Sequence, residues 1–290
     1  MPDITVIIVN WNVRELLRSC LTSVMAQHNV NAEVIVVDNA SHDGSVAMVR
    51  QEFPSIQVIA NDRNLGFATA NNQGIRQAHG RCLLLLNPDT DVPDGALAKT
   101  IRYFDEHPDV GIVGARLTNS DGSLQRSVRR DPTFAALALV LCKFQAFFPN
   151  LGPLRRYWYA DFDYTQEQDV SQVMGAFFAI NGEVPKKVGL LDEAFFLWFE
   201  EVDYCARVRR AGFRVRYVPT ISITHRGGES FRQLFNLRQQ IIFNASLLTY
   251  VKKHQPWRSW AALAVLTPVS LLFAIGEPLI RPLYAPKTLR

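Results

Sequence analysis

Two aspartates separated by one residue follow an apolar run that has the composition of a buried strand. Residues 81–91 read RCLLLLNPDTD, which places Asp89 and Asp91 directly after the run. In an extended backbone these two side chains point to the same face while Thr90 points away, so both carboxylates can reach one hard cation. Oxygen ligands of this kind suit Mg²⁺ or Mn²⁺. Asn, Pro and Asp are also common in turns, so the segment alone is explained equally well as a turn.

A second group of carboxylates lies far downstream. Glu200, Glu201 and Asp203 stand where an aromatic run, FFLWF, meets a predicted helix that ends at Gly212. The helix dipole favours acidic residues in a first turn by about 0.3–1 kcal/mol, so each has a structural explanation. Large apolar neighbours, however, remove water from a carboxylate and raise its pKa toward that of a useful general base. We therefore expect one of the three to be catalytic.

A histidine closes another predicted strand. Residues 215–224 have a strand pattern interrupted by Pro219, and His225 and two glycines follow. A lone histidine is more often structural than a ligand. Here the glycines permit close approach of another group, and an imidazole can complete a site with two carboxylates, most readily for Mn²⁺.

Apolar strands that alternate with amphipathic helices must position these residues. We expect strands at residues 4–9, 34–37, 56–60 and 82–86. Strands that are apolar on both faces indicate an α/β fold with a parallel sheet covered by helices on both sides. Each strand ends in polar residues, and such sheets bind ligands at the carboxyl ends of their strands. The sequence has neither of the glycine-rich phosphate-binding patterns G-x-G-x-x-G and G-x-x-x-x-G-K-[ST]. A diphosphate bound at this edge would therefore need a metal ion.

The composition is that of a globular enzyme with additional apolar surface. The chain has 290 residues, a net charge of +4 and 20% charged residues, so nucleic acid is not an expected partner. The four cysteines are far apart and have no metal-binding spacing, which is typical of buried thiols in a reducing compartment. No leader pattern precedes the first strand, so we expect the globular part in the cytoplasm.

Three further segments suit a phosphate or a membrane surface. Arg129 and Arg130, in a basic run, can meet phosphate or form a solvated surface. Residues 134–148 are apolar but too short to span a bilayer, and they fit either a membrane surface or the core. Residues 259–276 carry no charge and have basic flanks: Lys252, Lys253 and Arg258 before, and Arg281, Lys287 and Arg290 after. Because Pro268 interrupts this stretch, we expect a broken pair of interfacial or re-entrant helices facing anionic headgroups, with a true span or burial in a homodimer as alternatives.

In their order and spacing these motifs resemble glycosyltransferase family 2, the inverting enzymes of the GT-A fold, and especially its rhamnosyltransferase-like members. The resemblance covers residues 3–230. It rests on VIIVNWN at 6–12, VVDNAS at 36–41, NLGFATANN at 64–72, LNPDTD at 86–91, Gly175-Ala176, LDEAFF at 191–196, EEVD at 200–203 and HRGGES at 225–230. It implies a GT-A domain over residues 1–230, with a nucleotide-sugar half to about 115 and an acceptor half from about 116. A C-terminal helical, membrane-associating region would follow at residues 231–290.

The resemblance also assigns site residues. Asp38 would receive the nucleotide base, and the nucleotide-sugar pocket would be lined by Asn10, Trp11, Asp38, Asn64, Gly66, Asn71 and Asp89. Asp89 and Asp91 would form the D-x-D motif, with His225 near the metal and the diphosphate. The catalytic base of the family lies in a Glu-Asp-x-Asp motif, whose second position is Glu201 here. Asp203 is the alternative base.

The implied reaction is a metal-dependent single displacement with inversion. The base would take the proton of an acceptor hydroxyl while Mg²⁺ or Mn²⁺ offsets charge on the departing nucleoside diphosphate. The Gln-x-x-Arg-Trp motif of processive synthases is absent, which favours the addition of one or a few sugars. We expect L-rhamnose from dTDP-rhamnose as the donor sugar, with a UDP-hexose next. The expected acceptor is a glycan on a polyprenyl diphosphate at the cytoplasmic face of the membrane. A non-catalytic nucleotide-sugar-binding scaffold is the competing interpretation.

Overall fold

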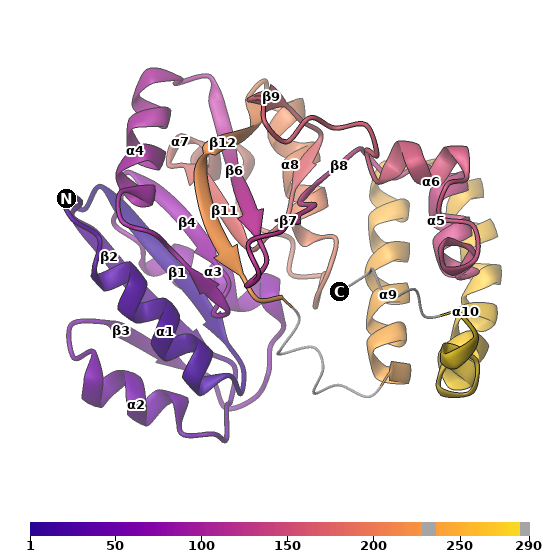
Figure 1. Ribbon diagram of the computed structural model, residues 1–290, viewed down its shortest axis with the longest axis horizontal. Coiled ribbons are helices and arrows are strands. Elements are labelled where there is room, and N and C mark those ends of the chain that lie inside the picture. Colours follow the sequence, from indigo (N-terminus) through magenta and orange to yellow (C-terminus); the bar gives the residue numbers. More distant parts are fainter. Residues whose placement is uncertain (228–235, 285–290) are drawn as a thin grey trace.

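A single mixed sheet forms the centre of the molecule, and helices cover both of its faces (Figure 1). The computed structural model describes the backbone of residues 1–227 and 236–284 and the side chains of residues 1–227 and 237–275. Within this described part, ten strands belong to the sheet, whose main path runs β3-β2-β1-β4-β11-β6-β12-β5. Strands β7 and β9 pair with β6 and β12 beside that path.

The first four strands are parallel, as the sequence predicts. Their bounds are β1 Ile4–Asn10, β2 Ala32–Asp38, β3 Gln57–Ala60 and β4 Cys82–Leu86. The helices that follow them are α1 Arg14–Met25, α2 Ser45–Glu52, α3 Phe67–Gln77 and α4 Ala96–Glu106. Successive side chains of a strand point to opposite faces, so Val6 joins the core beneath α1, α2 and α4 while Ile7 joins the core beneath α3. The carboxyl ends therefore meet at one edge, where Asn10 lies opposite Asp38.

The second half of the chain adds strands of both directions. β11 (Phe177–Asn181) runs antiparallel between β4 and β6 (Val110–Thr118), and β12 (Arg214–His225) runs parallel to β6. The end of β12 pairs with β5 (Thr90–Asp91), which places His225 opposite Thr90. The sheet thus joins the histidine to the aspartate segment.

Short elements surround the expected acceptor side of the sheet. A hairpin turn joins β6 to the next strand, where Gly122 N donates to Asn119 O at 2.9 Å. The short strands are β7 Leu124–Gln125, β8 Val128–Arg129, β9 Gln168–Asp169 and β10 Gln172–Val173. The helices are α5 Phe134–Leu141, η1 Phe144–Ala146, α6 Gly152–Tyr157, α7 Glu183–Val188 and α8 Glu200–Arg210. The apolar segment 134–148 therefore folds as α5 followed by η1.

Two C-terminal helices, α9 (Asn236–His254) and α10 (Trp257–Tyr284), pack against α5 and the start of α8. Their shared core contains Leu141 of α5, Phe199 and Val202 at α8, Val251 of α9 and Leu263 of α10. Figure 1 shows the two helices beside the end of the sheet rather than on either face. Because they share a core with α8, they help to fix the helix that carries the predicted catalytic carboxylates.

The break expected at Pro268 does not occur, because α10 continues through it. A proline inside a helix lacks the N–H that would reach the carbonyl four residues back. Here the Thr267 hydroxyl donates to that carbonyl, Ala264 O, at 2.8 Å. Asn244 of α9 donates to the Ser270 hydroxyl at 2.6 Å, which ties the same turn to the neighbouring helix. Local side chains thus replace the hydrogen bond that the proline removes.

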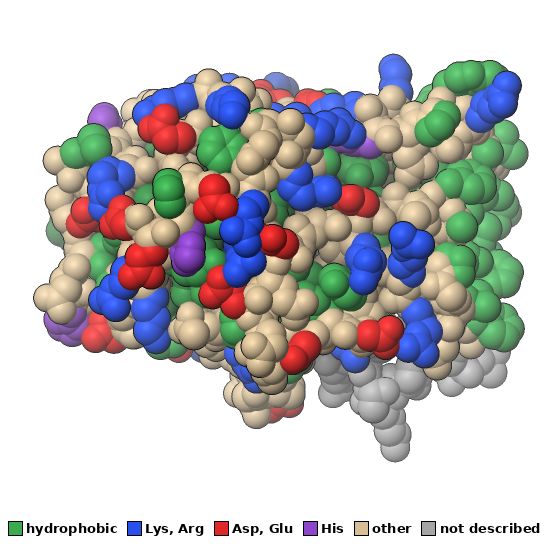
Figure 2. Space-filling model, turned by 90° about the horizontal axis from the view of Figure 1, so that it is seen from above, with side chains coloured by type: hydrophobic (Ala, Val, Ile, Leu, Met, Phe, Trp, Pro, Cys, Tyr) green, Lys and Arg blue, Asp and Glu red, His purple; other side chains and the backbone are tan. Residues whose placement is uncertain are grey.

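One side of α10 faces outward with apolar side chains. Val265 is 75% exposed and Leu272 is 69% exposed, whereas Leu263 and Ser270 on the inner side are buried. By length and composition, the helical stretch Trp257–Ile275 is long and apolar enough to cross a membrane. Of this stretch, 17% is buried inside the protein. Figure 2 shows hydrophobic side chains gathered along the edge of the molecule where α5, α6 and α10 lie. The basic residues expected after this stretch, Arg281, Lys287 and Arg290, lie outside the described side chains.

Candidate active site

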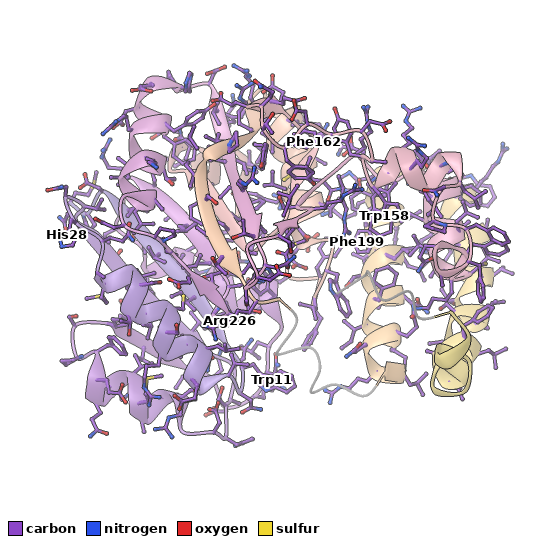
Figure 3. The ribbon with its side chains drawn as sticks, viewed as in Figure 1. Trp11, His28, Trp158, Phe162, Phe199 and Arg226 are labelled. Atoms are coloured by element: carbon purple, nitrogen blue, oxygen red, sulfur yellow. The ribbon has the colours of Figure 1, made fainter. Side chains whose placement is uncertain are left out.

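Asn10 and Asp38 lie side by side at the carboxyl ends of β1 and β2. Both are almost fully buried, and Asn10 Nδ2 donates to Asp38 Oδ2 at 3.1 Å and to the Ser41 hydroxyl at 3.1 Å. Ser41 N donates to the other carboxylate oxygen, Asp38 Oδ1, at 2.8 Å. Asn10 Oδ1 is buried without a partner among the described residues. Trp11 is half-buried at the same end of the sheet (Figure 3).

The loop before α3 is held against the segment that leads into α8. Asn64 Oδ1 accepts a hydrogen bond from Gly66 N at 2.9 Å, and Phe67 N donates to Phe196 O at 2.7 Å. Gly66 has φ +86°, and a Cβ there would lie 2.5 Å from Phe196 O. Asn71 Nδ2 donates to Phe67 O at 2.9 Å and its Oδ1 has no partner among the described residues. Asn64, Gly66 and Asn71 therefore shape this loop.

The backbone through Asp89 and Asp91 is not extended throughout, which corrects the geometry expected for the pair. Residues 88 and 89 form a turn and only Thr90–Asp91 is strand. The Thr90 hydroxyl donates to Asn87 O at 2.8 Å and closes that turn. Asp89 is buried, whereas Asp91 is exposed. The turn interpretation of the sequence therefore holds for residues 88 and 89, and the strand interpretation holds for Thr90 and Asp91.

His225 contacts Asp89 at the end of β12. Its Nε2 lies 3.2 Å from Asp89 Oδ1 and 3.3 Å from Asn87 Nδ2, and its Nδ1 lies 2.7 Å from Gln125 Oε1. An amide oxygen only accepts, so this pairing puts the proton on Nδ1 and leaves the Nε2 lone pair facing Asn87 and the carboxylate. A lone pair and a carboxylate at this distance suit a cation between them, and nitrogen and oxygen donors are appropriate for Mn²⁺. Within the described residues no group of three or more His, Cys, Asp and Glu could hold a metal, so these two groups would be a partial ligand set.

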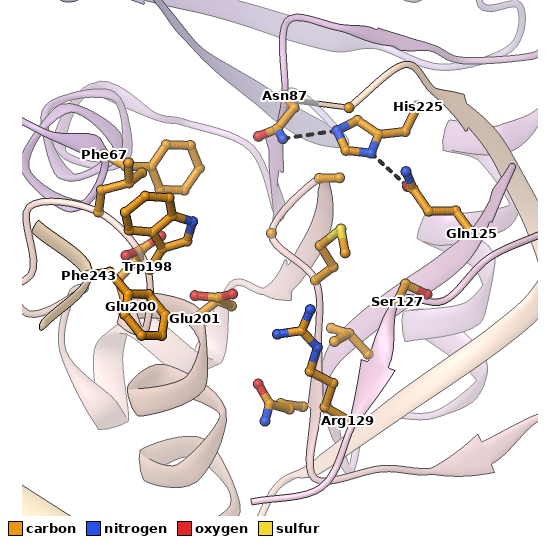
Figure 4. Close-up of a pocket in the computed structure, with 17 residues that line it drawn as sticks. Phe67, Asn87, Gln125, Ser127, Arg129, Trp198, Glu200, Glu201, His225 and Phe243 are labelled. Atoms are coloured by element: carbon orange, nitrogen blue, oxygen red, sulfur yellow. Dashed lines mark hydrogen bonds between the residues drawn. The ribbon is translucent and has the colours of Figure 1, made fainter. Parts of the chain in front are cut away.

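A cavity of about 540 Å³ is lined by His225 and by two of the three carboxylates considered as catalytic groups, Glu200 and Glu201. Figure 4 shows Glu200 and Glu201 on one wall, Asn87, His225 and Gln125 on another, and Arg129 facing Glu201. Burial, and then the charge of Glu201, raises the pKa of Glu200 well above its ordinary value. Burial also raises the pKa of Glu201. Both side chains line the cavity, and within the described residues the Oε2 atom of each is buried without a hydrogen-bond partner.

A strained turn presents these carboxylates. Trp198 and Phe199, directly before α8, have φ +66° and φ +68°, a region that bulky side chains rarely adopt. Such residues persist only where the surrounding packing determines them. The rings of Trp198 and Phe199 pack on Phe243 of α9 at 5.8 and 5.6 Å between centroids, and Ser246 donates to Leu197 O at 2.7 Å. Helix α9 therefore holds the turn that points Glu200 and Glu201 into the cavity.

Asp203 does not line this cavity. Two residues beyond Glu201 on α8, it faces the opposite side, where Arg207 Nε lies 2.8 Å from Oδ2 and Lys253 Nζ and His254 Nε2 lie 2.6 and 2.8 Å from Oδ1. Burial alone would raise the pKa of Asp203, but hydrogen bonds from these three partners hold it below its ordinary value. The buried carboxylate therefore anchors α9 to α8.

Comparison with solved structures agrees with the predicted GT-A fold. The mannosyltransferase PcManGT from Pyrobaculum calidifontis, solved with GDP-Man and Mn²⁺, superposes with a TM-score of 0.58 at 19% identity, over 97% of this chain and 75% of that chain. GalNAc-T7, solved with UDP, GalNAc and Mn²⁺, superposes with a TM-score of 0.57 at 16% identity, over 78% of this chain and 44% of that chain. The GT-A-like arrangement is thereby confirmed.

Sequence comparison gives the family. The N-acetylglucosaminyl-diphospho-decaprenol L-rhamnosyltransferase of Mycobacterium tuberculosis is 25% identical over 79% of this chain and 78% of its own length. The low-salt glycan biosynthesis hexosyltransferase Agl10 of Haloferax volcanii is 25% identical over 78% of this chain and 67% of its own length. The model of the family "Glycosyl transferase family 2" matches residues 5–186, more than half of the chain. The protein is therefore a glycosyltransferase that belongs to family 2.

Proposed function

We propose that this enzyme transfers L-rhamnose from dTDP-rhamnose, with inversion, to a hydroxyl of a glycan carried on a polyprenyl diphosphate. The observation that carries the proposal is the cavity in which Glu201 and His225 occupy different walls (Figure 4). Such a cavity can place an acceptor hydroxyl at the carboxylate and a leaving diphosphate at the histidine. The Mycobacterium tuberculosis relative supports the choice of sugar and acceptor, because its name states both.

Glu201 is the proposed catalytic base. Two adjacent buried carboxylates cannot both ionise readily, so one holds its proton while the other is charged. Glu200 has the more strongly raised pKa, partly through the charge of Glu201. Arg129 faces Glu201 across the cavity and its charge favours the ionised form of Glu201, which would accept the proton of the acceptor hydroxyl as the oxygen attacks the anomeric carbon. Asp203 is less suited to this role because its carboxylate is already paired with three basic side chains.

Asp89 and His225 are the residues proposed to hold Mg²⁺ or Mn²⁺, with the exposed Asp91 close in sequence as a further oxygen donor. When bound, the ion offsets the charge on the departing nucleoside diphosphate. Gln125 orients the imidazole through Nδ1, so that Nε2 faces the Asp89 carboxylate. Asn87 Nδ2 lies 3.3 Å from the same Nε2, a contact that a bound ion would replace because this nitrogen has one lone pair.

The nucleotide is proposed to bind at the ends of β1 and β2. Each Asp38 oxygen accepts one hydrogen bond within the protein and has a further lone pair that can accept the imide N–H shared by thymine and uracil. The loop shaped by Asn64, Gly66 and Asn71 and the ring of Trp11 would complete the pocket. Because thymine and uracil share this N–H, a UDP-hexose is the alternative donor.

The enzyme is proposed to lie on the cytoplasmic face of the membrane. Helix α10 buries its inner side against α9 and turns Val265, Leu272 and Ile275 outward, which suits a helix that lies in the interface. Helix α5 packs beside α10 (Figure 1), and the α5–η1 region has four exposed aromatic residues: Phe134, Phe144, Phe147 and Phe148. The basic residues Lys252 and Arg258 near the start of α10 can meet anionic headgroups.

Turnover tests the proposal directly. The purified protein is incubated with Mn²⁺ or Mg²⁺, a panel of nucleotide sugars and N-acetylglucosaminyl-diphospho-polyprenol, and release of nucleoside diphosphate is measured. We expect release from dTDP-rhamnose, and a faster rate with a UDP-hexose would replace the proposed donor. Glu201→Gln should lower kcat about 10²- to 10⁴-fold, the usual contribution of a general base, while the donor Kd stays unchanged. No release with any donor would contradict the proposed reaction.

A further inference from the structure

A second cavity, of about 360 Å³, adjoins the catalytic cavity. The two share Arg129, Trp198 and Phe243 in their linings. The second cavity is walled by α5, α6 and α9, and its apolar lining includes Leu137 and Val140 of α5. Beyond it the α5–η1 region presents the exposed rings of Phe144, Phe147 and Phe148. The lining also includes the polar side chains of Lys143, Gln145, Gln239 and Gln240, so the cavity offers aliphatic and aromatic surface beside groups that can bind an anion.

Arg129 stands where the two cavities meet. Its guanidinium lies 4.7 Å from the centre of the Trp158 ring and 5.9 Å from that of Tyr157, so aromatic stacking fixes its position. It faces Glu201 across the catalytic cavity, and its charge partly offsets the rise in the pKa of that carboxyl (Figure 4). A guanidinium held flat against a ring keeps its N–H edge free to bind phosphate in a bidentate manner.

We propose that Arg129 binds the diphosphate of the lipid-linked acceptor and that the second cavity holds the first isoprene units of its chain. This inference rests on the proposed function, since it concerns the acceptor of that reaction. The acceptor sugar would then lie at Glu201, its diphosphate at Arg129, and its chain between α5 and α9 on the way to the membrane. Arg129 is suited to the acceptor diphosphate rather than to that of the donor, because His225 lies at the other end of the catalytic cavity (Figure 4).

Arg129→Gln tests this assignment, and Arg130→Gln is its matched control. Arg130 is the next residue, but its guanidinium lies 4.0 Å from the centre of the Tyr159 ring and lines a different cavity with Arg155 and Arg156. We expect Arg129→Gln to raise the KM for the polyprenyl-diphosphate acceptor about 10- to 100-fold, the effect of losing a charged hydrogen bond. The donor KM and the KM of an alkyl glycoside acceptor without phosphate should not change, whereas kcat should fall equally with both acceptors because the charge of Arg129 favours the ionised form of Glu201. Arg129→Lys should restore part of the loss, and Arg130→Gln should behave as wild type.

Binding without turnover provides a second readout. Trp158 and Trp198 line the second cavity, so their fluorescence should change on titration with farnesyl diphosphate. Farnesol or inorganic pyrophosphate should bind more weakly than farnesyl diphosphate, and Arg129→Gln should abolish the difference between farnesyl diphosphate and farnesol.

The outcomes separate this inference from the proposed function. If wild-type protein turns over the lipid-linked acceptor but Arg129→Gln leaves its KM unchanged, the inference is wrong and the function stands. A rise in the donor KM instead would assign Arg129 to the leaving diphosphate. Equal binding of farnesyl diphosphate and farnesol by wild-type protein would likewise overturn the diphosphate site. Absence of turnover by wild-type protein with every donor would count against the proposed function.

Discussion

The two ends of the candidate active site differ in how their polar groups are satisfied. At the ends of β1 and β2, Asn10, Asp38 and Ser41 bond to one another, and a neutral amide oxygen, Asn10 Oδ1, is left without a partner among the described residues. In the cavity beside α8, Glu200 and Glu201 have buried oxygens without partners, and both have raised pKa values. The first region has its geometry before a ligand arrives. The second differs in that its unpaired oxygens belong to acidic side chains.

The two regions also differ in what holds them. The nucleotide end depends on adjacent parallel strands, whose register sets Asn10 opposite Asp38. The carboxylate end depends on contacts between distant segments, since α9 packs on the strained turn at Trp198 and Phe199. Unpaired and strained groups destabilise a fold, and they persist where other contacts offset that loss. The comparison therefore predicts that substitutions at the two ends change stability with opposite signs.

The largest effect on stability is expected from Asp203→Asn, which breaks the anchor between α8 and α9. Loss of one partner of a buried ion pair lowers the free energy of unfolding by about 3–5 kcal/mol. The pKa of Asp203 is lowered in the folded state, so its stabilisation is present above the unfolded pKa of about 3.9 and is lost as the pH falls through the folded pKa. Denaturant unfolding should show a large difference from wild type at neutral pH that shrinks below about pH 4.

The control for this prediction is Asp192→Asn. Asp192 shares Lys253 with Asp203 but is 32% exposed, so we expect a change within about 1 kcal/mol. If Asp203→Asn abolishes transfer with unchanged stability, Asp203 is a catalytic group and not an anchor.

A smaller loss of stability is expected from Asp38→Ala. It leaves the buried donors of Asn10 and Ser41 without their acceptor, which lowers the free energy of unfolding by about 1–3 kcal/mol. The donor KM should rise while the acceptor KM stays the same, as steady-state kinetics with each substrate varied in turn would measure. An unchanged donor KM would remove Asp38 from the proposed nucleotide pocket.

The smallest change, and one of opposite sign, is expected from Glu200→Gln. The pKa of Glu200 is higher in the folded protein than in the unfolded chain. Glu200 therefore stabilises the fold at pH values below its unfolded pKa, and this stabilisation is lost as the pH rises through its folded pKa. A glutamine cannot ionise, so the variant should have a higher Tm than wild type at about pH 8 and a similar Tm at about pH 4. We expect a gain of about 1–2 kcal/mol from thermal unfolding at the two pH values. A lower Tm at the higher pH would contradict the comparison between the two ends.

The sequence predicts the parallel half of the fold well, because buried strands alternate with helices of amphipathic pattern. It does not predict β11 (Phe177–Asn181), a five-residue strand that enters between β4 and β6 from a distant part of the chain. The break expected at Pro268 is wrong, since the Thr267 hydroxyl supplies the hydrogen bond that the proline lacks. Local pattern does not reveal such compensation.

The site shows a similar division. Each residue with a motif of its own, such as His225 or Glu201, can be selected from the sequence. Gln125 and Asn87 cannot, because their place at the site depends on contacts with His225 across the fold. Arg129 could be named only as one member of a basic run, and its position between two cavities depends on stacking against α6. Partners brought together by tertiary packing have no sequence signal of this kind.

The strained turn before α8 has a practical consequence for anyone who wishes to shorten this enzyme. Removal of α9 and α10 would eliminate an exposed apolar surface and is a natural route to a more soluble protein. It would also remove Phe243, which supports Trp198 and Phe199, and Lys253 and His254, which contact the Asp203 carboxylate. We expect the truncated protein to lose the carboxylate end of its site. Solubility is better sought by polar substitution of outward residues such as Val265 and Leu272, which leave the support of the turn in place.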